Sequence, residues 1–438
     1  MLGEQKSCGV LRGAILSCRT NKVPSNESDL LFLPDGVVVV SDGKIQDVMA
    51  ISDYKKSGGD ISVVEHLEDS LIVPGFIDAH IHHTQMGIIA SYGCQLLDWL
   101  ENYAFPAEKV FSDPELSRKQ AESFLECLFK HGTTTAMVFT SMHVQSAESL
   151  FEAARSRNVC MIAGKVMMDR GAPATLLDSS TGFDESAELI ERWHGQGRLC
   201  YAVTPRFALT STPTQLTAVQ HLLKQYPDIY LHTHLAENRS EVTQAEELYP
   251  DASSYTDIYA KYGLLTERSF FAHGIYLSDT DLQQLATAGS TIIFCPTSNM
   301  FLGSGLLNTS RLHECNVSMA IGTDIGGGTS YSMLATLGEG YKVSQLQGLS
   351  WDPVSAFHMI TAGNADALDL GHRIGRIAPG MDADLVVLKT DRHPILKSRL
   401  ANSNSLTERL FAMMILGDDR IVERTYVAGK LVHEAAVT

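Results

Sequence analysis

The chain has 438 residues, of which 44% are hydrophobic and 19% charged, and it carries a formal net charge of −17. An acidic surface of this kind excludes the basic footprint of a nucleic-acid-binding protein and disfavours docking on anionic lipid. The length exceeds the usual size of a single domain, so we expect one large domain with an appendage, or two domains.

The N-terminal stretch MLGEQKSCGVLRGAILSC has no basic region, long apolar segment or cleavage site typical of a signal peptide. No apolar run in the sequence reaches the length of a transmembrane helix. The eight cysteines form no C-x-x-C pair, which indicates reduced core thiols rather than a disulfide framework. These features predict a cytoplasmic protein that does not contact a membrane.

The first segment, residues 9–70, is rich in short β runs with turn signals. One of them, VVVVSDGKIQDV, contains Asp42-Gly43, a dipeptide that favours a tight two-residue hairpin. We therefore expect residues 1–73 to form part of a small β domain.

From residue 71 to residue 324, apolar β-rich runs alternate with amphipathic helical stretches. The clearest helix is expected after Ser112, with Ser112 as its cap, Pro114 in its first turn, Glu115 completing a capping box and Gly132 at its end. The alternation predicts an α/β fold, a (β/α)8 TIM-like barrel over residues 74–373. The eight expected strands are residues 71–78, 133–140, 160–168, 199–206, 229–234, 270–273, 292–294 and 317–323.

The last segment, residues 374–438, returns to short β runs such as GRIAPGMDADLVVL and IVERTYVAGKLVHE. Two β-rich flanks around a barrel most economically form one unit. We expect them to combine into a small β-sandwich domain built from both termini.

Polar side chains gather where the expected barrel strands end. The sequences there are HIH at residues 80–82, PRF at 205–207, HTHLAE at 232–237, AHG at 272–274 and GTD at 322–324. In a barrel of this type the C-terminal ends of the strands carry the chemistry. His80 and His82 point the same way because side chains alternate along a strand. The cluster of imidazoles and carboxylates predicts a divalent metal with an open position for water.

Longer stretches carry a family resemblance. PGFIDAHIH, HTHLAE, FFAHG and GTD, in this order, resemble the amidohydrolase superfamily over nearly the whole chain. Within it, QLLDWLENYAFPAE, AGKVMMDR, YAVTPRFALTSTP, CPTSNMFLGSG and GTDIGGGTSYS are similar to the guanine deaminases. The resemblance implies a barrel with a β domain, one zinc ion per subunit, a homodimer, and hydrolysis of guanine to xanthine and ammonia.

The resemblance also implies roles for individual residues. The metal ligands would be His80, His82, His234 and Asp324, the catalytic residues Glu237, His273 and Asp324, and the substrate-binding residues Gln85, Arg206, Phe207, His234, Glu237 and Asp324. Zinc would lower the pKa of its bound water, Asp324 would take the water's proton, and Glu237 would protonate the purine at N3. Arg206 offers a fork that matches O6 and N7 of guanine.

Other interpretations stay open. Arg206 could pair with a carboxylate, and Phe207 could belong to the core. Trp99 and Tyr103, four residues apart, are more typical of a helix packing face than of a stacking platform for a base. His83 is expected to face away from the metal and His232 to lie deeper, as a hydrogen-bonded residue.

The loop residues allow similar alternatives. Asn299 is expected to brace a loop, and Gly326–Gly328 to allow close backbone packing rather than to cradle a phosphate. His143, Asp169 and Arg170 lie at the expected rim without an assigned role.

Two rival functions remain. A sibling enzyme could deaminate another guanine-like heterocycle, such as a pterin, an oxidised purine or a triazine. A relative without activity could serve as a scaffold, although such proteins are expected to lose ligand residues that this chain keeps. Iron is an alternative to zinc for a site of three histidines and one aspartate.

Overall fold

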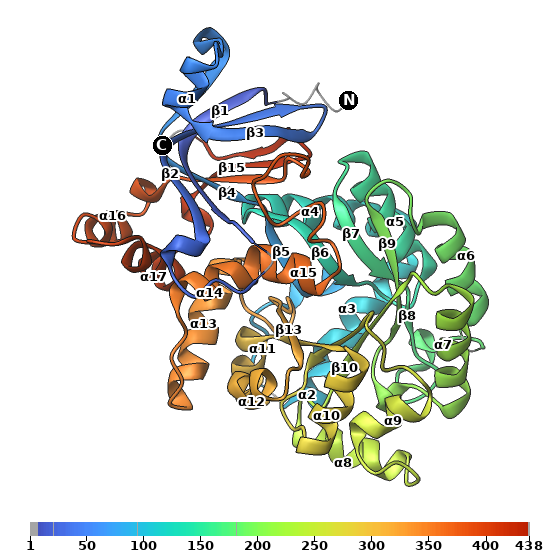
Figure 1. Cartoon of the computed structure of the whole chain (residues 1–438). Coiled ribbons are helices and arrows are strands. Elements are labelled where there is room, and N and C mark those ends of the chain that lie inside the picture. The colour runs from blue at the N-terminus through green and yellow to red at the C-terminus, as the bar shows by residue number, and fades with distance from the viewer. Residues whose placement is uncertain (1–7, 21, 94, 181, 437–438) are drawn as a thin grey trace.

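A computed structural model describes residues 8–20, 22–93, 95–180 and 182–436. Two sheets organise it (Figure 1). The larger is a nearly closed parallel barrel, and the smaller is a mixed sheet to which both ends of the chain contribute strands. In the described part of the chain, no helix combines the length and the apolar character needed to cross a membrane.

The barrel follows chain order around its circumference. Its strands are β5 (Phe76–His82), β6 (Thr133–Phe139), β7 (Cys160–Gly164), β9 (Leu199–Pro205), β10 (Tyr230–Leu235), β11 (Ser269–His273), β12 (Thr291–Phe294) and β13 (Ser318–Ile321). The short β8 (Val166–Met167) pairs with β9 beside β7. At the seam between the last and first strands, the Asp324 amide donates to the His80 carbonyl at 2.8 Å. The predicted parallel barrel is therefore confirmed.

The first predicted barrel strand, residues 71–78, is wrong in its extent. The structure divides this apolar run at Gly75, between β4 (Val64–Pro74) of the mixed sheet and β5 of the barrel. A Cβ atom on Gly75 would lie 2.0 Å from the Thr134 hydroxyl, so the crossing between the sheets has no room for a side chain. Hydropathy is equally high on both sides of this point and could not reveal it.

Helices surround the barrel, most of them on its outside and some over its ends (Figure 1). They are α2 (Leu96–Trp99), α3 (Phe105–Lys109), α4 (Pro114–Lys130), α5 (Val144–Ser156), α6 (Phe183–Trp193), α7 (Pro213–Gln225), α8 (Arg239–Leu248), α9 (Tyr255–Lys261), α10 (Asp279–Ala288), α11 (Pro296–Phe301), α12 (Thr309–Glu314), α13 (Met333–Leu346), α14 (Pro353–His358) and α15 (Asn364–Ala367). The remaining α-helices are α1 (Ile51–Lys56) in the N-terminal flank and α16 (Pro394–Leu400) and α17 (Leu406–Leu416) in the C-terminal flank.

The cap expected for helix α4 is wrong. Ser112 ends a 3-10 turn, and Asp113 is the cap, because its carboxylate accepts the amides of Glu115 at 2.8 Å and Leu116 at 3.3 Å. Asp113 has the extended backbone of a capping residue, and Pro114 follows in the first turn as expected.

The mixed sheet has the order β16-β15-β14-β4-β1-β2-β3. Besides β4, its strands are β1 (Val10–Cys18), β2 (Leu30–Ser41), β3 (Lys44–Ala50), β14 (Leu385–Leu388), β15 (Val422–Val427) and β16 (Lys430–Glu434). Strand β14 pairs with β4, which joins the C-terminal flank to the N-terminal one as predicted. The Asp42-Gly43 hairpin is also confirmed, with φ of 52° and 75° at its two residues.

The cysteines of the described ranges are all free thiols. This agrees with the interpretation of the cysteines as reduced, while Cys94 lies outside the described residues. Small and aliphatic side chains, among them Ile77, Ala79, Ile162 and Ala202, fill the barrel interior. The barrel is a packed core, and the polar residues of the site lie at one end of it.

Candidate metal and active site

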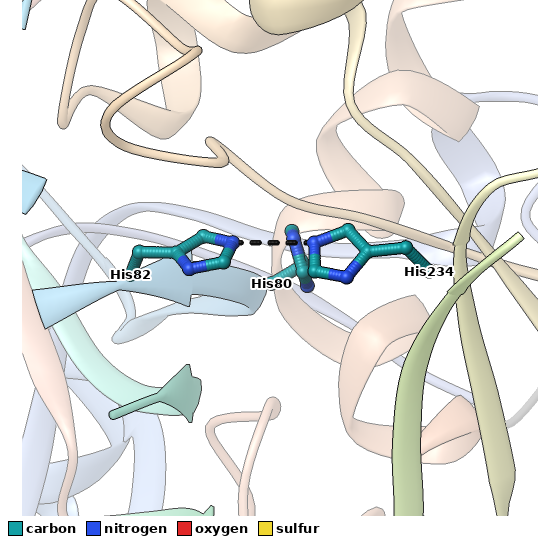
Figure 2. Close-up of side chains that lie close together, drawn as sticks. All are labelled: His80, His82 and His234. Carbon is teal, nitrogen blue, oxygen red and sulfur yellow. Dashed lines mark hydrogen bonds between the residues drawn. The ribbon is translucent and has the colours of Figure 1, made fainter. Parts of the chain in front are cut away.

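Three imidazoles and one carboxylate meet where barrel strands end. His82 ends β5 and His80 precedes it by two residues, His234 lies near the end of β10, and Asp324 follows β13. The Nε2 atoms of His80 and His82 lie 3.2 and 3.3 Å from Oδ1 of Asp324. The Nε2 atoms of His82 and His234 are 3.3 Å apart, and Figure 2 shows their rings approaching from opposite sides. The centroid of the His80 ring lies 5.0 Å from the centroid of each of them.

The donor atoms fit a divalent cation. Ligand atoms of His80, His82 and His234 lie within 4.8 Å of one another, and so do those of His80, His273 and Asp324. Nε2 of His80 is buried and has no hydrogen-bond partner, which is costly unless a cation accepts its lone pair. Three nitrogens and one oxygen form a donor set typical of zinc or iron.

The charge states suit such a cation. Burial lowers the pKa of His82 to about 4, and burial together with the neighbouring imidazoles holds the pKa of His234 well below its usual range. Neutral imidazole is the form that binds metal. Burial alone would raise the pKa of Asp324, but His80, His82 and His273 hold it well below its ordinary value. The site therefore presents neutral nitrogens and an ionised carboxylate.

A second layer of hydrogen bonds orients two of these rings. Nδ1 of His80 lies 2.7 Å from Nε2 of His232, and Nδ1 of His234 lies 2.7 Å from the Arg206 carbonyl. Partners of this kind fix ring orientation and leave Nε2 for the metal. His232 is thus the deeper, hydrogen-bonded residue that was expected. His83 faces away, with its ring nitrogens 3.4 Å from the Phe139 carbonyl and 3.5 Å from the Ser146 hydroxyl.

Glu237 and His273 lie beside this cluster. Nε2 of His273 is 3.3 Å from Oε2 of Glu237 and 3.8 Å from Oδ2 of Asp324. Burial, followed by the charge of Asp324, raises the pKa of Glu237 to about 8. A carboxyl with that pKa can hold a proton at neutral pH and release it during a reaction.

Two side chains that the sequence analysis did not place here hold this pair. The Ser304 hydroxyl donates to Oε1 of Glu237 at 2.8 Å, and Oδ1 of Asn299 lies 2.8 Å from Nδ1 of His273. Asn299 therefore positions an imidazole rather than only bracing its loop. Ser304 lies within the quoted stretch CPTSNMFLGSG, but its contact with Glu237, 67 residues away in the chain, could not be predicted from that stretch alone.

A capping box fixes the backbone at Glu237. Oε2 of Glu241 accepts the amides of Glu237 at 2.8 Å and Asn238 at 3.0 Å, and Asn238 caps helix α8. Glu241 also lines the pocket, and burial, followed by the charge of Glu237, raises its pKa to about 7. The Asn238 to Glu241 spacing is a helix-start signal, so the sequence contained the information needed to find this residue.

The backbone is strained at the same rim. His273, Asp324 and Ala236 have φ of 76°, 52° and 49°, in the left-handed region that non-glycine residues rarely adopt. Such conformations cost on the order of 1–3 kcal/mol each and cluster at functional sites. Here they turn His273 and Asp324 at the points where their strands end.

A pocket adjoins the cluster. Its lining residues are His82, Gln85, Leu96, Trp99, Leu100, Arg206, Phe207, His234, Glu237, Glu241, His273, Leu302, Asp324 and Gly327. Every residue expected to bind substrate is among them. Trp99 belongs to the pocket wall as well as to the core, whereas Tyr103 does not line the pocket.

Arg206 forms a buried ion pair within this wall. Its Nη1 donates to both carboxylate oxygens of Glu108, at 2.9 and 2.7 Å, and Nε2 of Gln85 donates to Glu108 at 3.0 Å. The open alternative, that Arg206 pairs with a carboxylate, is therefore correct, and Arg206 lines the pocket as well. Sequence reasoning assigned no role to Glu108, although it ends the quoted stretch QLLDWLENYAFPAE, because nothing local predicts its contact with Arg206.

Other rim residues have structural partners, except that Nε2 of His143, the residue before helix α5, is buried without a hydrogen-bond partner among the described residues. A Cβ atom on Gly326, which has φ of 118°, would lie 1.9 Å from Oε1 of Gln85, so close backbone packing is confirmed there. Asp169 accepts the Thr212 amide at 2.7 Å, and Arg170 donates to the carbonyls of Ala208 and Leu209. Asp169 and Arg170 therefore brace the loop that leads into helix α7.

Comparisons with known proteins show the family of the chain. The model of the amidohydrolase family matches residues 71–432. A guanine deaminase of Escherichia coli (strain K12) is 44% identical over 437 residues, which is 99% of this chain and 100% of the relative.

Solved structures give the same result. One of E. coli guanine deaminase superposes with a TM-score of 0.93 at 42% identity, covering 98% of this chain and 99% of that one. One of guanine deaminase from C. acetobutylicum, with guanine bound in its active site, superposes with a TM-score of 0.87 at 26% identity, covering 97% of this chain and 100% of that one.

Proposed function

The chain belongs to the amidohydrolase family, and on that premise we propose that it is a guanine deaminase, which hydrolyses guanine to xanthine and ammonia. The observation that carries the proposal is the meeting of His80, His82, His234 and Asp324 beside Glu237 at a pocket lined by Arg206. Similarity to guanine deaminases over the whole chain supports the choice of substrate.

We propose that these three histidines and Asp324 hold one zinc ion per subunit. The unpartnered Nε2 of His80 and the neutral imidazoles support a bound cation. When bound, zinc would lower the pKa of a water molecule and polarise it for attack. Iron is the alternative metal for the same donors.

The protein's own residues would then move the protons. Asp324 accepts a proton from the water that attacks C2 of guanine. Glu237, with Oε1 held by Ser304, delivers a proton from Oε2 to N3. The C2–O bond forms and the C2–N bond breaks, so one proton of the water ends on N3 and the other on the departing ammonia. His273, 3.3 Å from Oε2 of Glu237, assists in protonating the leaving amine.

Substrate recognition would rest on the pocket wall. The Arg206 guanidinium can donate to O6 and N7, which are adjacent acceptors on guanine. Adenine has a donor in place of O6 and would leave a buried N–H without a partner, which penalises it. Gln85 meets another polar edge of the base, and Phe207, which is 5% exposed, forms part of the wall.

A set of ammonia-release assays tests the proposal. Protein loaded with zinc or with iron is incubated with guanine, adenine, cytosine, a pterin and a triazine, and xanthine formation is followed in parallel. Guanine should be the preferred substrate, and chelation of the metal should abolish turnover. Activity on the pterin or the triazine without activity on guanine would favour the sibling-enzyme alternative.

Elemental analysis of the purified protein tests the scaffold alternative. A non-catalytic relative would bind no metal at this site, so bound metal would contradict that alternative. The homodimer and the cytoplasmic location stay predictions, which sedimentation and cell fractionation would test.

A further inference from the structure

One helical segment covers the pocket and contacts the substrate arginine. Helix α2, the π-helical turn η4 (Leu100–Ala104) and helix α3 follow one another without a break over residues 96–109. The first part supplies Leu96, Trp99 and Leu100 to the pocket wall. The last part supplies Phe105 and Glu108 to Arg206. A π turn shifts the phase of a helix and is frequent at functional sites.

Glu108 binds only one end of the Arg206 guanidinium. Both hydrogen bonds between them start from Nη1, at 2.9 and 2.7 Å, and the centroid of the Phe105 ring lies 5.3 Å from the guanidinium carbon. Glu108 is fully buried, and Arg206 is 2% exposed. Among the described residues, Nε and Nη2 of Arg206 have no hydrogen-bond partner. The carboxylate thus compensates the buried charge and leaves the Nε–Nη2 edge for another acceptor.

That edge has a chemical preference. Its two parallel N–H groups match two adjacent acceptors, and O6 with N7 of a 6-oxopurine forms such a pair. Restraining Nη1 removes rotational freedom that substrate binding would otherwise have to remove. Glu108 also accepts Nε2 of Gln85, so it positions two of the side chains that line the pocket.

We propose that Glu108 is a positioning residue that sets specificity for the 6-oxo group by orienting Arg206 and Gln85 from the pocket-covering helix. This inference rests on the proposed function, because it assigns Arg206 to that edge of the purine. It predicts that Glu108 affects ligands with a 6-oxo group far more than ligands without one.

The test compares hypoxanthine with unsubstituted purine. Neither has an amino group to lose, and only hypoxanthine has the 6-oxo group, so calorimetry with metal-loaded protein measures binding alone. In Glu108→Gln, we expect the preference for hypoxanthine over purine to fall about tenfold or more, as expected for a lost bidentate contact. The KM for guanine should rise more than kcat falls, with the metal content unchanged.

A matched control lies at the other end of strand β9, where Arg198 pairs with Asp384 in another buried ion pair. Asp384→Asn should lower stability but keep the wild-type preference for hypoxanthine. A general loss of packing would weaken both ligands equally, whereas the proposed role changes their ratio.

A second variant keeps the test decisive if Glu108→Gln fails to fold. Glu108→Asp retains the charge but withdraws the carboxylate by one methylene, and its preference should fall by a smaller factor. A wild-type preference in whichever variant folds would overturn the role of Glu108. A wild type that binds hypoxanthine in preference to purine but yields no xanthine from guanine would instead reject the proposed function.

Discussion

Strand β9 has a buried arginine at each end, and the two arginines are used differently. Arg198 precedes the strand, and its Nη1 and Nη2 both donate to Asp384, the residue before strand β14 of the mixed sheet. Arg206 follows the strand and donates to Glu108 through Nη1 alone. The first pair joins the barrel to the mixed sheet, whereas the second leaves an edge of the guanidinium for a ligand.

The residues around the two arginines differ in the same way. At the C-terminal end, Nε2 of His80 has no hydrogen-bond partner, and Asp324 and His273 adopt strained φ values. At the other end, the Asp384 carboxylate accepts from Arg198 and also from the Ala428 amide at 2.8 Å. Nε of Arg198 also lies 3.2 Å from Oδ2 of Asp382, so the charges at this end are paired across the two sheets, whereas the polar groups at the C-terminal end line a pocket where chemistry can take place.

The largest effect is expected from a variant at the C-terminal end of the barrel strands, where Glu237 lies. Glu237→Gln keeps the size of the side chain but cannot carry a proton, so kcat should fall by about 10²–10⁴-fold. Metal content, measured by elemental analysis, should stay at the wild-type level. Wild-type turnover in this variant would remove Glu237 from the mechanism.

Asp384→Asn tests the ion pair with Arg198 at the N-terminal end of strand β9. Breaking a buried ion pair costs about 3–5 kcal/mol, so the free energy of unfolding in urea should fall by that order. The kcat/KM for guanine, measured per folded subunit, should remain unchanged. A loss of kcat/KM without a loss of stability would contradict the division between the two ends.

Arg206→Lys tests the unused guanidinium edge. A lysine keeps the charge but cannot reproduce the fork, so discrimination of guanine against adenine should weaken by about tenfold. The matched variant Arg198→Lys should lower the melting temperature and preserve discrimination. Unchanged guanine kinetics in Arg206→Lys would count against its role in binding the base.

The smallest expected effect is a dependence of the free energy of unfolding on pH. The pKa of Glu237 is about 8 in the fold against an ordinary 4.5, so the native state keeps a proton that the unfolded chain releases. The stability of metal-free protein should therefore fall as the pH rises from about 4.5 to about 8.

Replacing Glu237 with glutamine should remove the contribution of one proton to the slope of the unfolding free energy against pH. That contribution is at most about 1.4 kcal/mol per pH unit. Glu241 and Asp78, whose pKa values burial raises to about 7, contribute in the same direction in both proteins. The difference between the two denaturation curves therefore reports the titration of Glu237 together with its effect on the neighbouring Glu241, and parallel curves would contradict the assignment.

The resemblance quoted from the sequence predicted the family, and the order of the motifs predicted which strand ends carry polar residues. Both are confirmed, because alternating apolar runs and the residues that follow them are local features of the chain. The predicted strand over residues 71–78 and the predicted Ser112 cap were wrong in detail. Hydropathy does not change at Gly75, and Asp113 is as good a capping residue as the adjacent Ser112.

The sequence by itself determined the barrel, the combination of the two β-rich flanks and the set of imidazoles and carboxylates, since periodicity and motif order fix which residues lie at strand ends. That the flanks form one mixed sheet, where a β-sandwich was predicted, was decided by the tertiary structure. Only the tertiary structure decided that Glu108 binds Arg206, that Ser304 binds Glu237, and that Asn299 binds His273. These partners lie between 26 and 98 residues apart in the chain. Their contacts depend on how helices and loops pack around the barrel end, and no local pattern records that packing.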